Sequence, residues 1–224
     1  MKGIFYGIGI GPGDPEHITL KAVRMMKEVD VIAAPGTDVK ETLAYRIAVQ
    51  AVPEIEQKEM LPIDMPMTLD KEILVKAHKH GAETIEKVLA KGKNVGFITL
   101  GDTTVYSTFS YLEKIVKNHG FETVYISGIT SFCAAAASLG IPLTEWQEPL
   151  HVIPAVHQLD DKLALDGSYV LMKSGRQMPK VKEILKASGR KVNMVENCGL
   201  PNENKYYSVE EIPDGAGYFS LIIA

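Results

Sequence analysis

A glycine-rich turn follows the first apolar stretch of the chain and strongly constrains the start of the fold. Residues Gly7-Ile-Gly-Ile-Gly-Pro-Gly-Asp-Pro15 join an expected strand to an expected helix, and such a junction lets backbone N–H groups approach a ligand closely. The spacing is not that of a dinucleotide fingerprint, because a G-x-G-x-x-G pattern begun at Gly7 ends on Pro12, and one begun at Gly9 ends on Asp14. Since Pro12 has no N–H and Asp14 would repel a phosphate, we do not expect a bound pyrophosphate here.

Strand and helix patterns alternate along the first half of the chain, which is typical of a parallel sheet covered on both faces. The second half has a small-residue helix and an expected antiparallel excursion at Asn202–Tyr207, so we expect a mixed sheet there. The sequence therefore predicts two α/β domains, residues 1–118 and residues 119–224. The expected strands are Ile4–Ile10, Val29–Ala34, Asn94–Leu100, Glu122–Ile126, His151–Pro154, Ser168–Met172, Val192–Glu196 and Gly217–Ile223. The expected helices are Glu16–Glu28, Glu41–Val52, Asp70–Lys91, Ser107–Asn118, Ser131–Leu139 and Met178–Ala187.

Composition excludes several classes of function. The 224 residues carry a net charge of −4, with 46% apolar and 23% charged residues, so no global attraction to nucleic acid or an anionic membrane is expected. No stretch approaches the roughly 20 apolar residues of a membrane span, and no signal peptide is evident. Cys133 and Cys198 are too few for a disulfide framework or a zinc site and indicate reduced thiols in a cytoplasmic protein. The six histidines form no metal-ligand pattern, so no metal is expected.

Three glycine-containing turns connect strands to helices, at Gly9–Pro15, Gly101–Ser107 and Gly128–Ser131. Ligands of open α/β sheets bind at the carboxyl ends of the strands, so these turns are expected to converge on one site. The alternative is that each glycine only permits its own tight turn. Asp102, in the second turn, either accepts hydrogen bonds from a ligand or caps the following helix.

The alanine run after the third turn, within Ser131–Leu139, permits close packing against a sheet or against a flat ligand. The polar loop Pro35–Lys40 and the proline-rich stretch Leu61–Thr68 are candidates for the walls of a cleft. The chain has no P-loop, no H-E-x-x-H, no G-x-S-x-G and no C-x-x-C motif. With no obvious nucleophile–base pair, the sequence favours a reaction in which the protein positions two reactants, such as transfer from an activated donor.

Taken together, the three turns resemble the tetrapyrrole methylase family of S-adenosylmethionine-dependent enzymes. Gly7–Ala22 is similar to the opening motif of the family, Leu100-Gly-Asp-Thr-Thr-Val-Tyr-Ser107 to its G-D-P-x-x-Y loop, and Ser127-Gly-Ile-Thr-Ser131 to its P-G-I-T-S loop. Thr103 and Ser127 stand where the family usually has proline. Residues 104–112, 132–143 and 148–154 look most like the members that methylate C20 of precorrin-2 or of cobalt-factor II in cobalamin biosynthesis.

The resemblance implies two α/β domains with the active site in the cleft between them, a homodimer, and S-adenosylmethionine as methyl donor. It assigns cofactor contacts to Pro12, Leu100, Gly101, Asp102, Val105, Thr130, Ser131, Met172, Cys198, Ser220 and Leu221. Met172, Cys198 and Leu221 are apolar enough to form an adenine slot, although core packing explains Met172 equally well. The base that removes the C20 proton stays open among Asp102, Tyr106 and Glu145. Lys40, Arg46, Lys173 and Arg176 are the candidates for binding substrate carboxylates.

Overall fold

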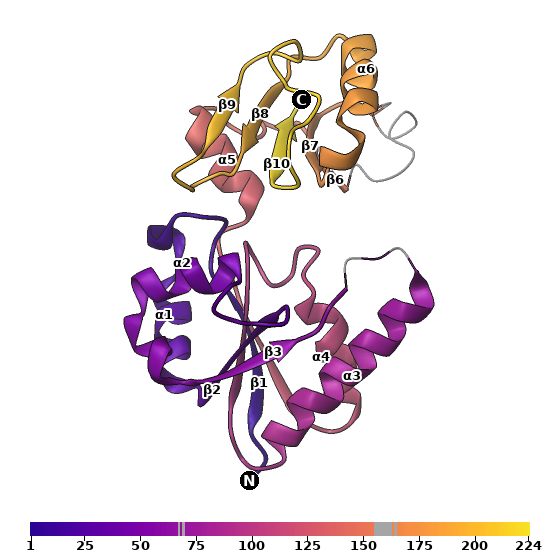
Figure 1. Cartoon of the computed structure of the whole chain (residues 1–224). Coiled ribbons are helices and arrows are strands. Elements are labelled where there is room, and N and C mark those ends of the chain that lie inside the picture. Colours follow the sequence, from indigo (N-terminus) through magenta and orange to yellow (C-terminus); the bar gives the residue numbers. More distant parts are fainter. Residues whose placement is uncertain (67, 69, 155–162, 164) are drawn as a thin grey trace. The chain divides into compact units, whose positions relative to one another are not determined.

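The chain divides into two compact units, Met1–Thr130 and Ser131–Ala224. The structure, a computed structural model, describes residues 1–66, 68, 70–154, 163 and 165–224 (Figure 1). The division after Thr130 differs from the boundary expected after Asn118, because strand β5 (Glu122–Ile126) pairs with β1 (Ile4–Gly9) and so belongs to the first unit. The residues between the two positions complete the N-terminal sheet instead of starting the second one.

The N-terminal sheet has five strands in the order β3-β2-β4-β1-β5, and every neighbouring pair is parallel. Besides β1 and β5, its strands are β2 (Val31–Pro35), β3 (Glu59–Ile63) and β4 (Val95–Thr99). The expected parallel sheet is therefore confirmed. Strand β3 was not expected, since its Pro62 lies in the stretch assigned to a proline-rich loop. It pairs with β2 at the edge of the sheet, where proline is tolerated.

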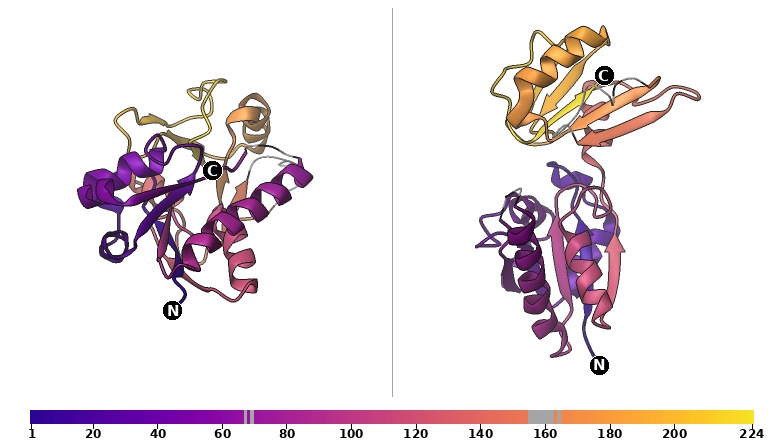
Figure 2. Two further views of the ribbon diagram at one scale, coloured as in Figure 1. Left: turned by 60° about the horizontal axis from the view of Figure 1, so that its bottom comes forward. Right: turned by 90° about the vertical axis from the view of Figure 1, so that its right-hand side faces the viewer.

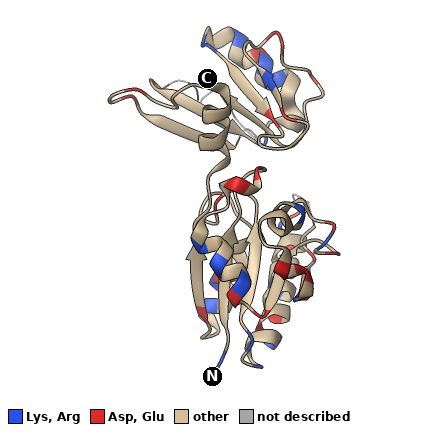
Figure 3. Cartoon of the chain, turned by 90° about the vertical axis from the view of Figure 1, so that its left-hand side faces the viewer, with Lys and Arg blue, Asp and Glu red and all other residues tan. Residues whose placement is uncertain are grey.

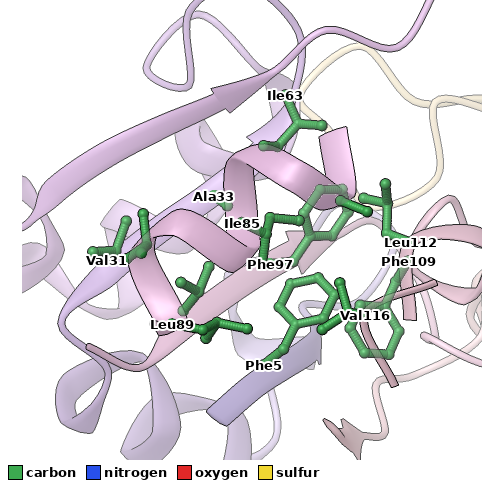
Figure 4. Close-up of a cluster of buried hydrophobic side chains, with 13 residues drawn as sticks. Phe5, Val31, Ala33, Ile63, Ile85, Leu89, Phe97, Phe109, Leu112 and Val116 are labelled. Carbon is green, nitrogen blue, oxygen red and sulfur yellow. The ribbon is translucent and has the colours of Figure 1, made fainter. Parts of the chain in front are cut away.

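Helices α3 (Lys71–Leu89) and α4 (Phe109–Asn118) cover one face of this sheet. Figure 4 shows Phe5 and Phe97 from the strands next to Phe109 from α4. The ring centroids of Phe5 and Phe109 are 4.9 Å apart. All three rings are fully buried. A Cβ placed on Gly7 would lie 2.5 Å from the ring of Phe109, so this glycine of the opening motif is required by core packing.

Helices α1 (Leu20–Glu28) and α2 (Leu43–Ala51) lie on the other face, as Figures 1 and 2 show. Each begins at a threonine whose hydroxyl accepts a backbone hydrogen bond, from Ala22 to Thr19 and from Tyr45 to Thr42, both at 3.2 Å. The helix expected from Glu16 thus starts later, and a short 3-10 turn, η1 (Pro15–His17), precedes it. A second one, η2 (Pro53–Gln57), follows α2.

The C-terminal sheet has the order β6-β7-β10-β8-β9 and is mixed, because β6 and β7 are parallel while the other pairs are antiparallel. This confirms the expected mixed sheet. Its strands are β6 (Leu150–Pro154), β7 (Ser168–Met172), β8 (Asn193–Glu196), β9 (Asn204–Tyr206) and β10 (Ser220–Ile223).

Among the described residues of this unit, one α-helix packs on each face of the sheet. Helix α5 (Ser131–Leu139) buries Ala134, Ala135 and Ala136 against one set of strand side chains. Helix α6 (Met178–Ser188), which follows the short turn η4 (Gly175–Gln177), buries Met178, Val181 and Leu185 against the alternate set. The alanine run therefore serves close helix–sheet packing.

Figure 3 shows that both units carry Lys and Arg as well as Asp and Glu. Within the described ranges, no helix is both long enough and apolar enough to cross a membrane.

Candidate functional site

The three glycine turns meet at the carboxyl ends of β1, β4 and β5. Gly11 and Gly101 form an isolated antiparallel bridge, in which the Gly101 amide donates to the Gly11 carbonyl at 2.8 Å and the Gly11 amide donates to the Gly101 carbonyl at 3.2 Å. The positive φ angles of Gly11 (76°) and Gly101 (71°) suit glycine at both positions. The first and second turns are thus joined through their backbones.

The third turn approaches so closely that side chains have no room. A Cβ on Gly9 would lie 2.6 Å from the Gly128 amide nitrogen, and a Cβ on Gly128 would lie 2.2 Å from the Gly101 carbonyl oxygen. The expected convergence of the three turns is therefore confirmed. These glycines do more than permit separate local turns, since they allow three backbone segments to touch.

Both carboxylate oxygens of Asp102 accept hydrogen bonds that stabilise the junction of the turns. Oδ2 accepts a hydrogen bond from the Gly128 amide at 2.9 Å, and Oδ1 accepts from the Thr104 amide at 2.7 Å and from the Thr104 hydroxyl. The residue is only 7% exposed. Asp102 does not cap α4, because the Phe109 amide at the start of that helix donates to the Ser107 hydroxyl at 3.2 Å.

Two buried polar atoms near the junction have no hydrogen-bond partner among the described residues: Oγ1 of Thr130 and Nδ1 of His17. Thr130 lies near the end of the third turn. His17 packs against Gly11, because a Cβ added to Gly11 would lie 2.9 Å from the Cβ of His17. A buried hydroxyl without a partner is costly. A polar ligand that contacts Thr130 would remove this cost.

The remaining residues expected in the N-terminal part of the site lie in the same turns. Gly101 is buried, whereas the others are partly exposed, and Ser131 is the first residue of α5 in the second unit. The partly exposed set is Pro12, Leu100, Val105, Thr130 and Ser131.

The expected C-terminal contacts gather at one end of the second sheet. Strand β10 runs antiparallel to both neighbours, so its first residues meet the last residues of β7 and β8: Leu221 pairs with Met172, and Ser220 with Glu196. The Ser220 hydroxyl donates to the Gly217 carbonyl at 2.7 Å, and the Gly217 amide donates to Oε1 of Glu196 at 2.5 Å.

Strained backbone marks the expected site loops of both units. Tyr106 (φ 48°), Lys173 (φ 62°) and Asn197 (φ 56°) adopt positive φ without being glycine, a conformation that costs energy and is concentrated at functional positions. Lys173 directly follows β7, and Asn197 directly follows β8.

Met172, Cys198 and Leu221 lie together on the α5 face of the sheet, in one cluster with the alanines of that helix. Cys198 is 7% exposed and Leu221 6%, while Met172 is partly exposed. Burial, followed by the charge and hydrogen bonding of Glu203, raises the pKa of the Cys198 thiol to about 12. The thiol therefore stays protonated and acts as a small apolar side chain.

The candidate groups for base and substrate binding differ in their local surroundings. Tyr106 is 46% exposed, and Glu145 lies in an exposed loop where its amide donates to Glu148. Arg46 pairs with Glu41 at 2.5 Å, and Lys40 is exposed. The side chain of Arg176 lies outside the described residues.

Sequence reasoning missed Glu203, whose carboxylate accepts hydrogen bonds from the Ser138 hydroxyl at 2.6 Å and from the Gly199 amide at 2.7 Å. It also missed the exposed pair Tyr218 and Phe219, whose ring centroids lie 5.4 Å apart just before β10. No local motif marks these residues, because their contacts depend on the tertiary fold.

The chain belongs to the family of Tetrapyrrole (Corrin/Porphyrin) Methylases, whose model matches residues 5–213. Two relatives carry more specific names. A probable cobalt-precorrin-2 C(20)-methyltransferase of Methanocaldococcus jannaschii is 35% identical over 199 residues, which cover 88% of this chain and 84% of the relative. A precorrin-2 C(20)-methyltransferase of a Sinorhizobium species is 31% identical over 234 residues, covering 99% and 94%.

The fold is also that of a solved methyltransferase. The crystal structure of a uroporphyrin-III C-methyl transferase from Thermus thermophilus, complexed with S-adenyl homocysteine, matches 99% of this chain and 96% of its own with a TM-score of 0.72 and 22% sequence identity. At this level of identity the likeness establishes the fold.

Proposed function

We propose that the chain is an S-adenosylmethionine-dependent methyltransferase that methylates C20 of precorrin-2 or of cobalt-factor II in cobalamin biosynthesis. Family membership supports methyl transfer to a tetrapyrrole. The names of both relatives support C20 as the position, and they differ on whether the substrate already holds cobalt. A sister methylase of other regiospecificity and a non-catalytic tetrapyrrole- or nucleotide-binding protein are the alternatives to be tested.

One observation carries the cofactor assignment, namely the contact of Gly9, Gly101 and Gly128 at the carboxyl ends of three parallel strands. In the third of these turns, the unpartnered Thr130 hydroxyl is available to donate to or accept from a polar ligand. A hydroxyl suits the amino and carboxylate groups of the methionine end of S-adenosylmethionine, which need acceptors and donors. Met172, Cys198 and Leu221 provide the apolar surface that the adenine needs.

S-adenosylmethionine supplies an electrophilic methyl group when it is bound, so the protein has little covalent chemistry to perform. The turns around Gly101 and Gly128 orient the donor, and their close packing keeps that orientation fixed. The buried surroundings of Cys198 and Leu221 exclude water from the adenine side. The tetrapyrrole substrate carries many carboxylates, for which Lys40, Arg46, Lys173 and Arg176 remain the cationic candidates.

We further propose a homodimer in the cytoplasm. The homodimer is supported by the resemblance to the family and by Tyr111 and Tyr125, which are 52% and 38% exposed on α4 and on the edge strand β5. Two free cysteines, Cys133 and Cys198, support a reducing compartment. Sedimentation velocity over a range of concentrations measures the oligomeric state, and a monomer throughout would contradict the homodimer.

Turnover with a defined substrate tests the proposed activity. The purified protein is incubated with S-adenosylmethionine and either precorrin-2 or cobalt-factor II, and the products are analysed by mass spectrometry. We expect one methyl group to be added to the macrocycle and one equivalent of S-adenosylhomocysteine to form. Binding of the macrocycle without methyl transfer would support the non-catalytic alternative instead.

A further inference from the structure

The loop between β8 and β9, residues 197–203, holds one of the proposed adenine contacts, Cys198. Two backbone turns shape this loop, since the Leu200 amide donates to the Asn197 carbonyl at 2.9 Å and the Glu203 amide donates to the Leu200 carbonyl at 3.0 Å. Asn197 and Gly199, on either side of Cys198, both have positive φ. A loop with this backbone needs specific contacts to keep one conformation.

The Glu203 carboxylate provides those contacts. Oε2 accepts from the Gly199 amide at 2.7 Å, next to Cys198, and Oε1 accepts from the Ser138 hydroxyl at 2.6 Å, in the last turn of α5. Lys205 lies 3.4 Å from Oε1 and donates to the Ser138 carbonyl at 2.6 Å. The end of the loop is thus tied both to its own beginning and to the helix that packs behind Cys198.

We infer that Glu203 is a positioning residue for S-adenosylmethionine, because it holds Cys198 in place against α5 and the first residues of β10. The inference rests on the proposed function and deepens it. Glu203 acts on S-adenosylmethionine indirectly, through the loop that holds Cys198. Loss of its carboxylate should therefore weaken cofactor binding more than substrate binding. Charge-assisted hydrogen bonds such as these are stronger than neutral ones.

Hydrogen bonds from Ser138, Gly199 and Lys205 keep the Glu203 carboxylate ionised. Although burial alone would raise its pKa, these bonds and the charge of Lys205 lower the pKa below its ordinary value of 4.5. The ionised carboxylate in turn contributes to the high pKa of the Cys198 thiol, after burial itself. The pH at which Cys198 reacts therefore reports in part on the Glu203 contact.

The test compares Glu203→Gln with Glu210→Gln, which removes the same charge from an exposed glutamate in the same unit, 3.9 Å from Lys186. We expect Glu203→Gln to raise the Kd for S-adenosylmethionine about ten-fold in calorimetry, with the tetrapyrrole KM unchanged. In a Cys133→Ser background, we expect alkylation of Cys198 to begin at lower pH in Glu203→Gln. Glu210→Gln should match the wild type in all three measurements.

Ser138→Ala, which loses only one hydrogen-bond donor at a helical position, accompanies these variants in case Glu203→Gln does not fold. Its Kd for S-adenosylmethionine should rise a few-fold, by about the value of one hydrogen bond. Wild-type affinity in both variants, with only a lower Tm, would overturn the inference and leave the proposed function intact. Failure of the wild type itself to bind S-adenosylmethionine would overturn the proposed function, and the inference with it.

Discussion

Asp102 and Gly128 are joined by a hydrogen bond of 2.9 Å from the Gly128 amide to Oδ2 of the carboxylate. The bond links the turn after β4 to the turn after β5 and closes the junction that Gly11 and Gly101 begin. The sequence allowed two roles for the Asp102 carboxylate, a ligand contact or a helix cap. The structure shows a third role, which is to hold two turns together.

Substitution of Asp102 by asparagine should loosen this junction. The amide retains one oxygen, so it cannot accept from both Gly128 and Thr104, and we expect stability to fall by about 1–3 kcal/mol. We also expect weaker binding of S-adenosylmethionine. Urea unfolding and calorimetry measure the two effects. Asp38→Asn is the matched control, because Asp38 accepts from the Lys40 amide in an exposed turn; equal losses in the two variants would contradict this role of Asp102.

Gly128→Ala tests whether the contact between the turns depends on glycine. The added Cβ would lie 2.2 Å from the Gly101 carbonyl oxygen, so a backbone segment must move, and overpacking of this kind costs about 1–3 kcal/mol. Gly215→Ala serves as control, since no atom lies within 4 Å of its added Cβ, and it should change the unfolding free energy by less than about 0.5 kcal/mol. Unchanged stability of Gly128→Ala would show that the turns do not touch.

Sequence patterns predicted the types of both sheets and most of the helices, because apolar periodicity and glycine-containing turns are local signals. They placed the domain boundary after Asn118, because no local feature shows that β5 (Glu122–Ile126) pairs with β1. They also missed β3, where Pro62 suggested a loop although an edge strand accepts proline.

The candidate site was predictable where its residues belong to contiguous motifs, as at Gly101 and Gly128. It was less predictable where function depends on contacts between distant positions. Glu203 lies 65 residues from Ser138 in sequence, and nothing in its immediate neighbourhood indicates that it holds the Cys198 loop.

The two cysteines should differ sharply in reactivity. Cys133 is exposed, whereas Cys198 is buried with a pKa of about 12, and only a thiolate reacts readily. At pH 8, we expect a disulfide reagent to titrate one thiol rapidly in the native protein and the second only after unfolding. This rapid reaction should be absent in Cys133→Ser and present in Cys198→Ser. A rapid reaction that is still seen in Cys133→Ser would contradict the burial of Cys198.

Acid should weaken the fold partly through Glu203. Its pKa is lower in the folded chain than the ordinary value of 4.5, so the unfolded chain takes up the proton first as the pH falls. The stabilisation is therefore complete above about pH 4.5 and is lost as the pH falls through the folded pKa. Urea unfolding between pH 6 and pH 3 should show a shallower loss in Glu203→Gln than in the wild type, and parallel curves would contradict this contribution.

The position of the transferred methyl group tests the central claim most directly. The protein is incubated with precorrin-2 or cobalt-factor II and S-adenosylmethionine carrying a carbon-13 methyl group, and the product is examined by NMR. We predict one labelled methyl group on C20 of the macrocycle. A label on any other ring carbon would identify a methylase of different regiospecificity, and no label on either substrate would contradict the proposed activity.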